Sequence, residues 1–279
     1  MVTASSPNST LQHISGPVVL AGAGKMGGAM LTGWLAGGLD PKRVAVIEPF
    51  PSDDIRALVA NGIRLNPQPG DVGHAATLVV ALKPQSFREA GAALKPFVGS
   101  STLVVSIMAG MPIAAIAEVC GGSVVRAMPN TPAAIGRGIT VAVAAGNVVA
   151  GQRAVADALL RATGSVEWVD DEKLMDAVTA VSGSGPAYVF LLAEELARAG
   201  IEAGLPPELA TKLARETVAG SGELLHRSEL ASAVLRQNVT SPGGTTAAAL
   251  EVLMGADGLQ SLMTRAVAAA TRRSKDLAK

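Results

Sequence analysis

Three glycines near the start of the chain stand at the spacing of a phosphate-binding turn. The stretch reads Gly22-Ala23-Gly24-Lys25-Met26-Gly27 and lies between a predicted strand and a predicted helix. In such a turn the first glycine permits the sharp bend, the second lets the backbone approach a pyrophosphate, and the third lets helix and strand pack closely. The helix N-terminus adds free N–H groups and a partial positive charge. We therefore predict a dinucleotide site, with a merely structural glycine turn as the alternative.

Glu48 bears on which dinucleotide is bound. It ends the next predicted strand, 21 residues after Gly27. A carboxylate there can accept hydrogen bonds from a ribose 2′-OH, which favours NAD, and it repels the 2′-phosphate of NADP. Against this, the loop from Pro49 to Ser52 offers backbone groups and a hydroxyl to a phosphate, and Arg56 lies one helical turn away. A solvated surface glutamate is the simplest alternative, so NADPH and NADH both remain open as cofactors.

The ends of three further predicted strands carry residues suited to the same cleft, because open α/β sheets bind ligands at the carboxyl ends of their strands. Ala81-Leu82-Lys83-Pro84 places a lysine where it can lie along a ribose or phosphate, or simply at the surface. Ser106-Ile107-Met108-Ala109-Gly110 brings small residues that can approach a nicotinamide. Met128-Pro129-Asn130-Thr131-Pro132 forms either a rigid floor under the reacting ring or no more than a structural turn.

Two segments in the second half are too irregular for ordinary helix. One is Ser182-Gly183-Ser184-Gly185-Pro186, and the other is Val239–Thr246, which contains the run Ser241-Pro242-Gly243-Gly244-Thr245-Thr246. Backbone N–H groups and hydroxyls presented together at a helix start form a carboxylate receptor that needs no cationic side chain. The alternative is that Thr245 or Thr246 only caps the helix. Capping needs one threonine and does not need the run before it, so we favour an anion site.

Short β-branched runs alternate with helical segments through the first part of the chain. We expect strands at Val18–Ala21, Val44–Ile47, Leu78–Leu82, Leu103–Ile107, Val124–Ala127, Thr140–Val143 and Ser165–Val169, and helices at 25–37, 53–61, 86–94, 112–119 and 151–162. Near-continuous apolar strands separated by helices indicate a doubly wound parallel sheet covered on both faces. From Asp170 onward we find no convincing strand, and helical spacing recurs at 171–181, 186–203, 207–226, 246–254 and 259–277.

The predicted fold class is therefore α/β, with an N-terminal Rossmann-type sheet followed by an all-α C-terminal domain. We expect a loose tail over residues 1–16, a dinucleotide-binding domain over 17–169 and a helical domain over 170–279. This division agrees with the length of the chain, because 279 residues exceed one typical domain.

Composition narrows the class of partner. Lys+Arg and Asp+Glu number 23 each, so the chain has no basic excess with which to bind nucleic acid. The single cysteine, Cys120, excludes an internal disulfide and a thiolate-rich zinc site. The longest apolar run, 103–119, is interrupted by Gly110 and Pro112 and reads better as strand, loop and helix than as a membrane span. We expect a cytoplasmic protein that acts on a small molecule.

Taken together, these motifs closely resemble those of the pyrroline-5-carboxylate reductase family, from about residue 17 to the C-terminus. The resemblance is carried by Ala81–Pro84, Arg126–Pro132, Asp176–Tyr188 and Val239–Thr246, of which the last two are highly specific. It implies NADPH- or NADH-dependent reduction of Δ1-pyrroline-5-carboxylate to L-proline. It also implies that the helical domain forms a homodimer by interleaving with its twin, with a decamer of five dimers as the larger assembly.

Carried over by position, the resemblance assigns roles to individual residues. Cofactor contacts fall on Gly22–Gly27, Ala81–Pro84, Ala109, Gly110 and Asn238, while Ser241, Gly244, Thr245 and Thr246 hold the substrate carboxylate and ring nitrogen. The chain departs from the family at Glu48, where many relatives have a small or polar residue, and at Met108, where they often have alanine. The first departure leaves the cofactor preference undecided, and the second adjusts packing beside the nicotinamide.

Hydride transfer to an imine carbon needs neither a covalent nucleophile nor a metal, because the cofactor carries the chemistry while the protein positions and polarises the substrate. An oxygen near the imine nitrogen favours the more reactive iminium. We expect Thr246 to be this hydrogen-bond partner. Glu229 is a weaker candidate for a nearby charge, the alternative being a solvated residue on a helix face.

Three rival functions share parts of this pattern. A β-hydroxyacid dehydrogenase of the same two-domain plan needs a lysine or histidine to move the alcohol proton, and none stands in a convincing site. A reductase of a different cyclic imine has the same two-domain plan. A non-catalytic, nucleotide-sensing protein would keep the glycine turn but has no reason to retain the hydroxyl-rich segment.

Overall fold

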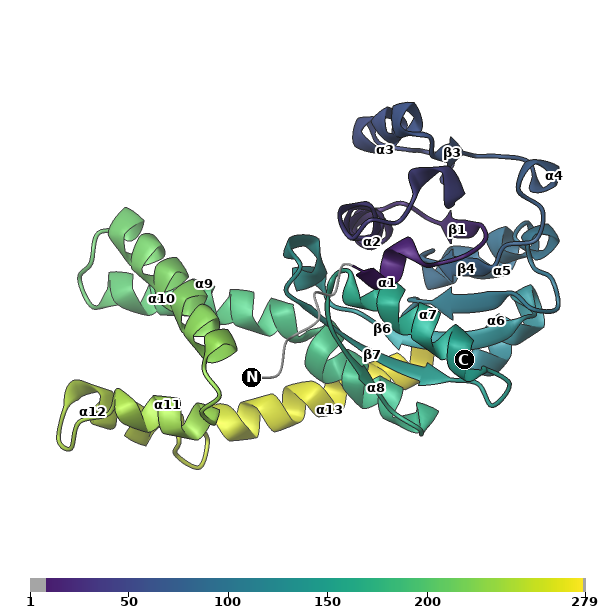
Figure 1. Cartoon of the computed structure of the whole chain (residues 1–279). Helices are drawn as coiled ribbons and strands as arrows, with labels where there is room; N and C mark the ends of the chain where they lie inside the picture. Colours follow the sequence, from purple (N-terminus) through teal and green to yellow (C-terminus); the bar gives the residue numbers. More distant parts are fainter. Residues whose placement is uncertain (1–8, 278–279) are drawn as a thin grey trace, which may run out of the picture. The chain divides into compact units, whose positions relative to one another are not determined.

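The computed structural model describes residues 9–277, which fall into two compact units (Figure 1). The first unit runs to Gly183 and also takes in the chain from Thr271, while the second spans Ser184–Ala270. The division predicted between residues 169 and 170 therefore lies earlier in the chain than the division in the structure. The end of the C-terminal helix belongs to the first unit, a long-range association that helical spacing does not reveal.

An eight-stranded sheet forms the centre of the first unit, in the order β3-β2-β1-β4-β5-β6-β7-β8. The strands are β1 (Val18–Ala21), β2 (Val44–Ile47), β3 (Arg64–Leu65), β4 (Thr77–Val80), β5 (Leu103–Ser106), β6 (Ser123–Met128), β7 (Gly138–Ala144) and β8 (Gly164–Trp168). Neighbouring strands are parallel except β6 and β7, which are antiparallel. The strand order reverses between β1 and β4, which is where open α/β sheets bind ligands. The doubly wound sheet is confirmed, with one antiparallel pair that the prediction missed.

Helices connect the strands of the first unit. They are α1 (Ser9–Gln12), α2 (Lys25–Ala36), α3 (Asp53–Ala57), α4 (Pro69–Val72), α5 (Pro84–Ala92), α6 (Ile113–Cys120), α7 (Ala150–Arg161) and α8 (Met175–Val178). Shorter 3₁₀ turns lie at Pro41–Arg43, Leu58–Asn61, Lys95–Phe97, Thr131–Ile135 and Glu172–Leu174, and a π-helical turn at Thr179–Gly183. The elements missed from sequence, β3 and α4, are too short to show a period.

Alternate residues of the central strands enter separate cores on the two faces of the sheet. Val18 and Leu20 belong to the cluster that α2 and α7 cover, whereas Val19 and Ala21 belong to the cluster that α5 and α6 cover. Every position of β1, β4 and β5 is buried. Since neither face meets water, these strands read as continuous apolar runs instead of alternating ones.

The start of the described chain packs onto this sheet. Residues 9–12 form α1, and Leu11 and Ile14 are buried in the cluster that contains Val18. The expected loose tail over residues 1–16 is therefore wrong from residue 9 onward, because two apolar side chains three residues apart find a place in the core. Residues 1–8 of that prediction lie outside the described part of the chain.

The second unit contains helices α9 (Gly185–Glu202), α10 (Pro207–Arg227), α11 (Ser232–Asn238) and α12 (Thr245–Leu253), together with most of α13 (Leu259–Leu277). After β8 the described residues contain no strand, in agreement with the prediction. Helix α11 was missed, since its seven residues are too few for a clear period. None of the described helices combines the length and the apolar character that crossing a bilayer requires.

The second unit has almost no core of its own. Of its described residues, only Ala210 and Ala214 are buried apolar ones. Large apolar side chains are instead exposed on α9 (Val189, Phe190, Leu191, Leu192, Leu196, Ile201), α10 (Leu209, Leu213, Leu224, Leu225) and α13 (Leu259, Leu262, Met263). Extended apolar surface of this kind marks a protein–protein interface.

Candidate dinucleotide and substrate sites

The three glycines of the turn differ in what a side chain would meet at each position. Gly22 has φ +91°, and a Cβ there would lie 2.6 Å from the carbonyl oxygen of Ala81. A Cβ at Gly27 would overlap the carbonyl oxygen of Gly22. A Cβ at Gly24 would instead have no described atom within 4 Å. The first and third glycines are thus required by the fold, while the second keeps a space open on the outside of the turn, where a pyrophosphate can approach.

Helix α2 begins within this stretch, at Lys25, and its N-terminus can bind an anion. Gly24 is its N-cap, and no described side chain caps the first turn. The first N–H groups of a helix have no partner within it, and they carry a partial positive charge. The residues present therefore fit the pyrophosphate of a dinucleotide.

Glu48 follows β2 and contacts the glycine turn. Its Oε2 accepts a hydrogen bond from the N–H of Ala23 at 2.9 Å, and its Oε1 accepts one from the N–H of Phe50 at 3.0 Å. The backbone of Glu48 is bound on both sides by Asn66, whose Oδ1 accepts from the Glu48 N–H at 2.8 Å and whose Nδ2 donates to the Glu48 carbonyl at 2.9 Å. Glu48 is therefore held in place, and the alternative of a freely solvated glutamate is wrong.

A cavity of about 280 Å³ lies at the carboxyl ends of β4, β5 and β6. Its lining brings together Met26, from the glycine turn, and five residues predicted at the strand ends: Ala81, Lys83, Pro84, Met108 and Ala109. Met128–Thr131 and Gly183 complete the wall. Gly110 is not among the lining residues; it is buried with φ +73°, and a Cβ there would contact Leu277 at the end of α13.

A second cavity, of about 350 Å³, lies beside β1 and β2. Its lining includes Ala21, Ile47, Pro49, Asn66 and Pro67. Neither Asn66 nor Pro67 is among the predicted site residues; their only signal in the sequence is the asparagine-proline pair after the two-residue strand β3. The glycine turn follows β1. One cavity is lined by residues at the end of β2, and the other by residues at the ends of β4, β5 and β6. This is the division that the two halves of a dinucleotide require.

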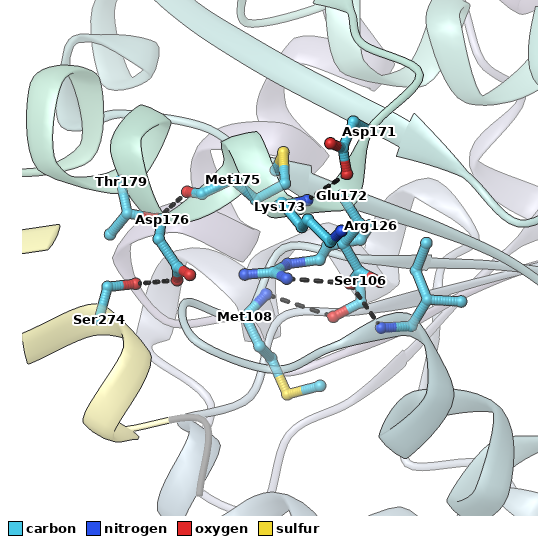
Figure 2. A network of polar contacts seen from close by, with 11 residues as sticks. Ser106, Met108, Arg126, Asp171, Glu172, Lys173, Met175, Asp176, Thr179 and Ser274 are labelled. Carbon is cyan, nitrogen blue, oxygen red and sulfur yellow. Dashed lines mark hydrogen bonds and ion pairs between the residues drawn. The ribbon is translucent and has the colours of Figure 1, made fainter. Parts of the chain in front are cut away.

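A polar network fixes the segment that precedes the second unit (Figure 2). Arg126, in β6, is buried, and its Nη1 donates to Glu172 Oε1 at 2.9 Å. The same oxygen accepts the N–H of Ile113 at 2.8 Å. Further along, the hydroxyl of Ser274 donates to Asp176 Oδ1 at 2.7 Å, which ties α8 to the end of α13. The signal for Arg126 was present in the sequence, because an arginine within an apolar strand needs a buried partner.

The segment from Ser182 to Pro186 departs from regular α-helix between α8 and α9, as expected. Thr179–Gly183 forms a π-helical turn that continues from α8, and Ser184 is the N-cap of α9. Gly183 lies close to the end of the Met128 side chain, which would have to move to make room for a Cβ. Single π-turns occur frequently at functional sites, and this one brings Gly183 to the smaller cavity.

In the second unit, the predicted anion segment forms a tight turn before α12. The N–H of Gly244 donates to the carbonyl of Ser241 at 3.0 Å, and Gly243 has φ +68°, a conformation that favours glycine. Gly244 is the N-cap of α12, and no described side chain caps that helix. The alternative that Thr245 or Thr246 merely caps it is therefore wrong. The helix start instead presents backbone N–H groups and two threonine hydroxyls together.

Two other predicted residues of this unit are exposed. Asn238 is the last residue of α11, just before the turn. Glu229 lies in the loop between α10 and α11, not on a helix face as expected, because α10 ends at Arg227.

Cys120 is a small buried residue. It packs in the core cluster with Leu78 and Ile116 at the end of α6. Burial raises the pKa of its thiol to about 11. The thiolate needed for nucleophilic or metal chemistry is therefore scarce at neutral pH, and no group of described His, Cys, Asp and Glu residues could hold a metal ion.

A doubly wound sheet with a glycine turn, an uncapped helix start and cavities at its strand ends defines a dinucleotide-binding oxidoreductase. Comparison with known proteins narrows this class. Residues 17–110 match a family described as NADP oxidoreductase, coenzyme F420-dependent, and residues 172–277 match pyrroline-5-carboxylate reductase dimerisation. The chain belongs to the pyrroline-5-carboxylate reductase family.

Individual relatives agree with this assignment along nearly the whole chain. The chain is 38% identical to the pyrroline-5-carboxylate reductase of Pseudomonas aeruginosa, covering 94% of this chain and 96% of the relative. It is 41% identical to that of Synechocystis, covering 86% and 89%. Among solved structures, the reductase of Coxiella burnetii is similar with a TM-score of 0.87 at 34% identity, covering 95% of this chain and 100% of that one. The Plasmodium falciparum enzyme, solved with NADP bound, has a TM-score of 0.79 at 29% identity, covering 94% and 98%.

Proposed function

We propose that this chain reduces Δ1-pyrroline-5-carboxylate to L-proline with NADPH or NADH, the last step of proline synthesis. Family membership supports the reaction. The structural observation that carries the proposal is the cavity at the ends of β4, β5 and β6. There, residues from the glycine turn and from all three predicted strand ends line one space, although Met26 and Thr131 are 105 positions apart.

The first unit binds and orients the cofactor. The N–H groups at the start of α2 hold the pyrophosphate, and Lys83 lies beside the ribose or phosphate at the edge of the smaller cavity. Met108, Ala109 and the Met128–Thr131 wall shape the space for the nicotinamide. Bound NAD(P)H supplies the hydride. The protein therefore needs no nucleophile of its own.

The second unit holds the substrate. Ser241, Gly244, Thr245 and Thr246 surround the start of α12, where backbone N–H groups and hydroxyls bind the carboxylate without a cationic side chain. The Thr246 hydroxyl hydrogen-bonds to the ring nitrogen and favours its protonated form, which accepts hydride more readily. Asn238 contacts the cofactor. Glu229 contributes a negative charge near the ring nitrogen of the substrate.

The second unit also forms the homodimer. Its exposed apolar side chains on α9, α10 and α13 need a partner surface, because only two alanines of the described unit are buried apolar residues. A homodimer formed through these helices, within a decamer of five dimers, gives them that partner.

Initial rates test this function directly. The purified chain is mixed with NADPH or NADH and with five- or six-membered cyclic imine carboxylates, and oxidation of the cofactor is followed together with formation of the amino acid. We expect the five-membered imine to give L-proline in proportion to the cofactor oxidised. If neither cofactor is oxidised when Δ1-pyrroline-5-carboxylate is added, the proposed reaction is wrong.

A further inference from the structure

We propose that Glu48 recognises the adenosine ribose of the cofactor and makes this chain prefer NADH to NADPH. This inference rests on the proposed function, and it assigns the cofactor choice to one side chain. Because the Glu48 carboxylate accepts from the N–H of Ala23 at 2.9 Å, it lies against the turn that holds the pyrophosphate. The adenosine ribose is joined directly to that pyrophosphate, so its hydroxyls come within reach of the carboxylate.

Glu48 is positioned for this contact by Asn66. Asn66 pairs with both the N–H and the carbonyl of Glu48, and its own N–H donates to the carbonyl of Val46 at 2.7 Å. Its φ is +49°, and it is the only residue other than glycine with a positive φ in the described chain. Asparagine tolerates this conformation better than most residues. The chain thus uses an uncommon backbone geometry to hold the end of β2, and Asn66 is a positioning residue.

The Glu48 carboxylate keeps the capacity to bind ribose hydroxyls. An ionised carboxylate has about four acceptor positions on its two oxygens. The N–H groups of Ala23 and Phe50 use one on each oxygen. The remaining positions can accept from the 2′-OH and 3′-OH of NADH, whereas a 2′-phosphate has no hydrogen to donate when fully ionised and is repelled.

The segment that follows Glu48 carries more negative than positive charge. Asp53 and Asp54 occupy the first turn of α3, and Arg56, the next cation after Glu48, has its Nε 4.0 Å from Asp53 Oδ1. The Ser52 hydroxyl accepts from the N–H of Ile55 at 3.4 Å as the helix cap. Glu48 and the first turn of α3 together carry three carboxylates against one arginine, a charge balance that disfavours a 2′-phosphate. Lys25 stands at the glycine turn itself, beside the pyrophosphate that both cofactors share.

Binding of cofactor fragments tests the inference without any turnover. ADP-ribose and 2′-phospho-ADP-ribose are titrated into the full-length chain by calorimetry, at low and at moderate salt. We expect ADP-ribose to bind at least about tenfold more tightly, with the ratio falling as salt rises, because charge repulsion is screened. Glu48→Gln keeps an acceptor for Ala23 but removes the charge, so the ratio should shrink toward one. Glu118→Gln, an exposed residue of α6, is the control with the same change in net charge.

Asn66→Gly provides a second variant in case Glu48→Gln fails to fold. It keeps the backbone conformation accessible and removes only the side-chain amide that holds Glu48. We expect its discrimination between the two fragments to weaken, a change that general destabilisation of the fold would not produce.

Two results of these titrations would overturn the inference. The wild-type chain could bind 2′-phospho-ADP-ribose as tightly as ADP-ribose, or Glu48→Gln could leave the ratio unchanged. A chain that binds neither fragment overturns the inference and the proposed function together. A chain that oxidises NADPH and NADH equally well with the imine, and binds both fragments equally, leaves the proposed function standing while the assignment of Glu48 fails.

Discussion

Arg126 and Glu172 form an ion pair that joins the sheet to the segment leading into the second unit. Arg126 Nη1 lies 2.9 Å from Glu172 Oε1, and the arginine side chain is only 7% exposed. Removal of one partner from such a pair leaves a buried charge uncompensated, which costs more than the pair itself contributes. The contact therefore matters for stability even though Glu172 is partly in contact with solvent.

We expect Glu172→Ala to destabilise the folded chain by about 2–4 kcal/mol, because it leaves Arg126 and the Ile113 N–H without their acceptor. Urea unfolding at fixed protein concentration measures this difference. Glu167→Ala, at an exposed position of β8, is the control and should change stability by less than about 0.5 kcal/mol. Equal effects of the two substitutions would contradict a structural role for the ion pair.

Gly24→Ala should separate cofactor binding from folding. The position has an ordinary φ of −67° and no described atom near a new Cβ, so we expect an almost unchanged melting temperature. The added methyl group occupies the approach of the pyrophosphate, and NADH binding should weaken at least about tenfold. Gly27→Ala is the opposite case, since its Cβ overlaps the Gly22 carbonyl and folding itself should suffer. Fluorescence titration with NADH and thermal unfolding check both; unchanged affinity in Gly24→Ala would argue against the turn as the phosphate site.

The buried thiol of Cys120 should lower the free energy of unfolding at alkaline pH. Burial raises its pKa from 9.0 to about 11, so the folded chain retains the thiol proton more firmly than the unfolded chain does. The contribution to stability is complete below pH 9 and is lost as pH rises toward 11. We expect Cys120→Ala to remove this part of the slope when unfolding is measured from pH 8 to 11. An identical slope in both proteins would contradict the assignment to Cys120.

The sequence predicts the glycine turn well because its requirements are local. The sharp bend at Gly22 and the close approach at Gly27 follow from the order of strand, turn and helix. The partners of Glu48 could not be predicted in the same way. Asn66 reaches Glu48 only because the short strand β3 pairs with β2, and two residues carry no detectable period.

Long-range contacts account for most of the other differences between the structure predicted from the sequence and the observed one. The polar side chains of Arg126 and Glu172 lie 46 positions apart, and those of Asp176 and Ser274 lie 98 apart. Hydrophobic spacing shows which face of an element is buried but not what that face meets. For the same reason the end of α13 was placed in the helical domain, although its contacts belong to the first unit.

The exposed apolar surface of the second unit predicts that stability depends on protein concentration. A chain whose helices find their core in a partner is stabilised by association, so its melting temperature should rise with concentration. We expect Leu196→Asp, on α9, to convert the dimer to monomer in sedimentation measurements and to lower the melting temperature. Val59→Asp alters a similarly exposed residue of the first unit and should leave the assembly intact. A wild-type chain that sediments as a monomer would contradict the proposed dimer.

Thr246→Ala tests the chemistry at the start of α12. Loss of one hydrogen bond to a charged group is worth roughly 1.5–3 kcal/mol, so kcat/KM for the imine should fall about 10- to 150-fold. NADH binding should be unchanged, because Thr246 is proposed to contact the substrate and not the cofactor. Thr211→Ala is the matched control: its hydroxyl donates to the Pro207 carbonyl within α10, and its removal should leave kcat/KM near the wild-type value. If a folded Thr246→Ala enzyme matched the wild type in steady-state kinetics, the ring nitrogen would need another hydrogen-bond partner, and the backbone N–H groups beside Gly244 would be left with the carboxylate alone.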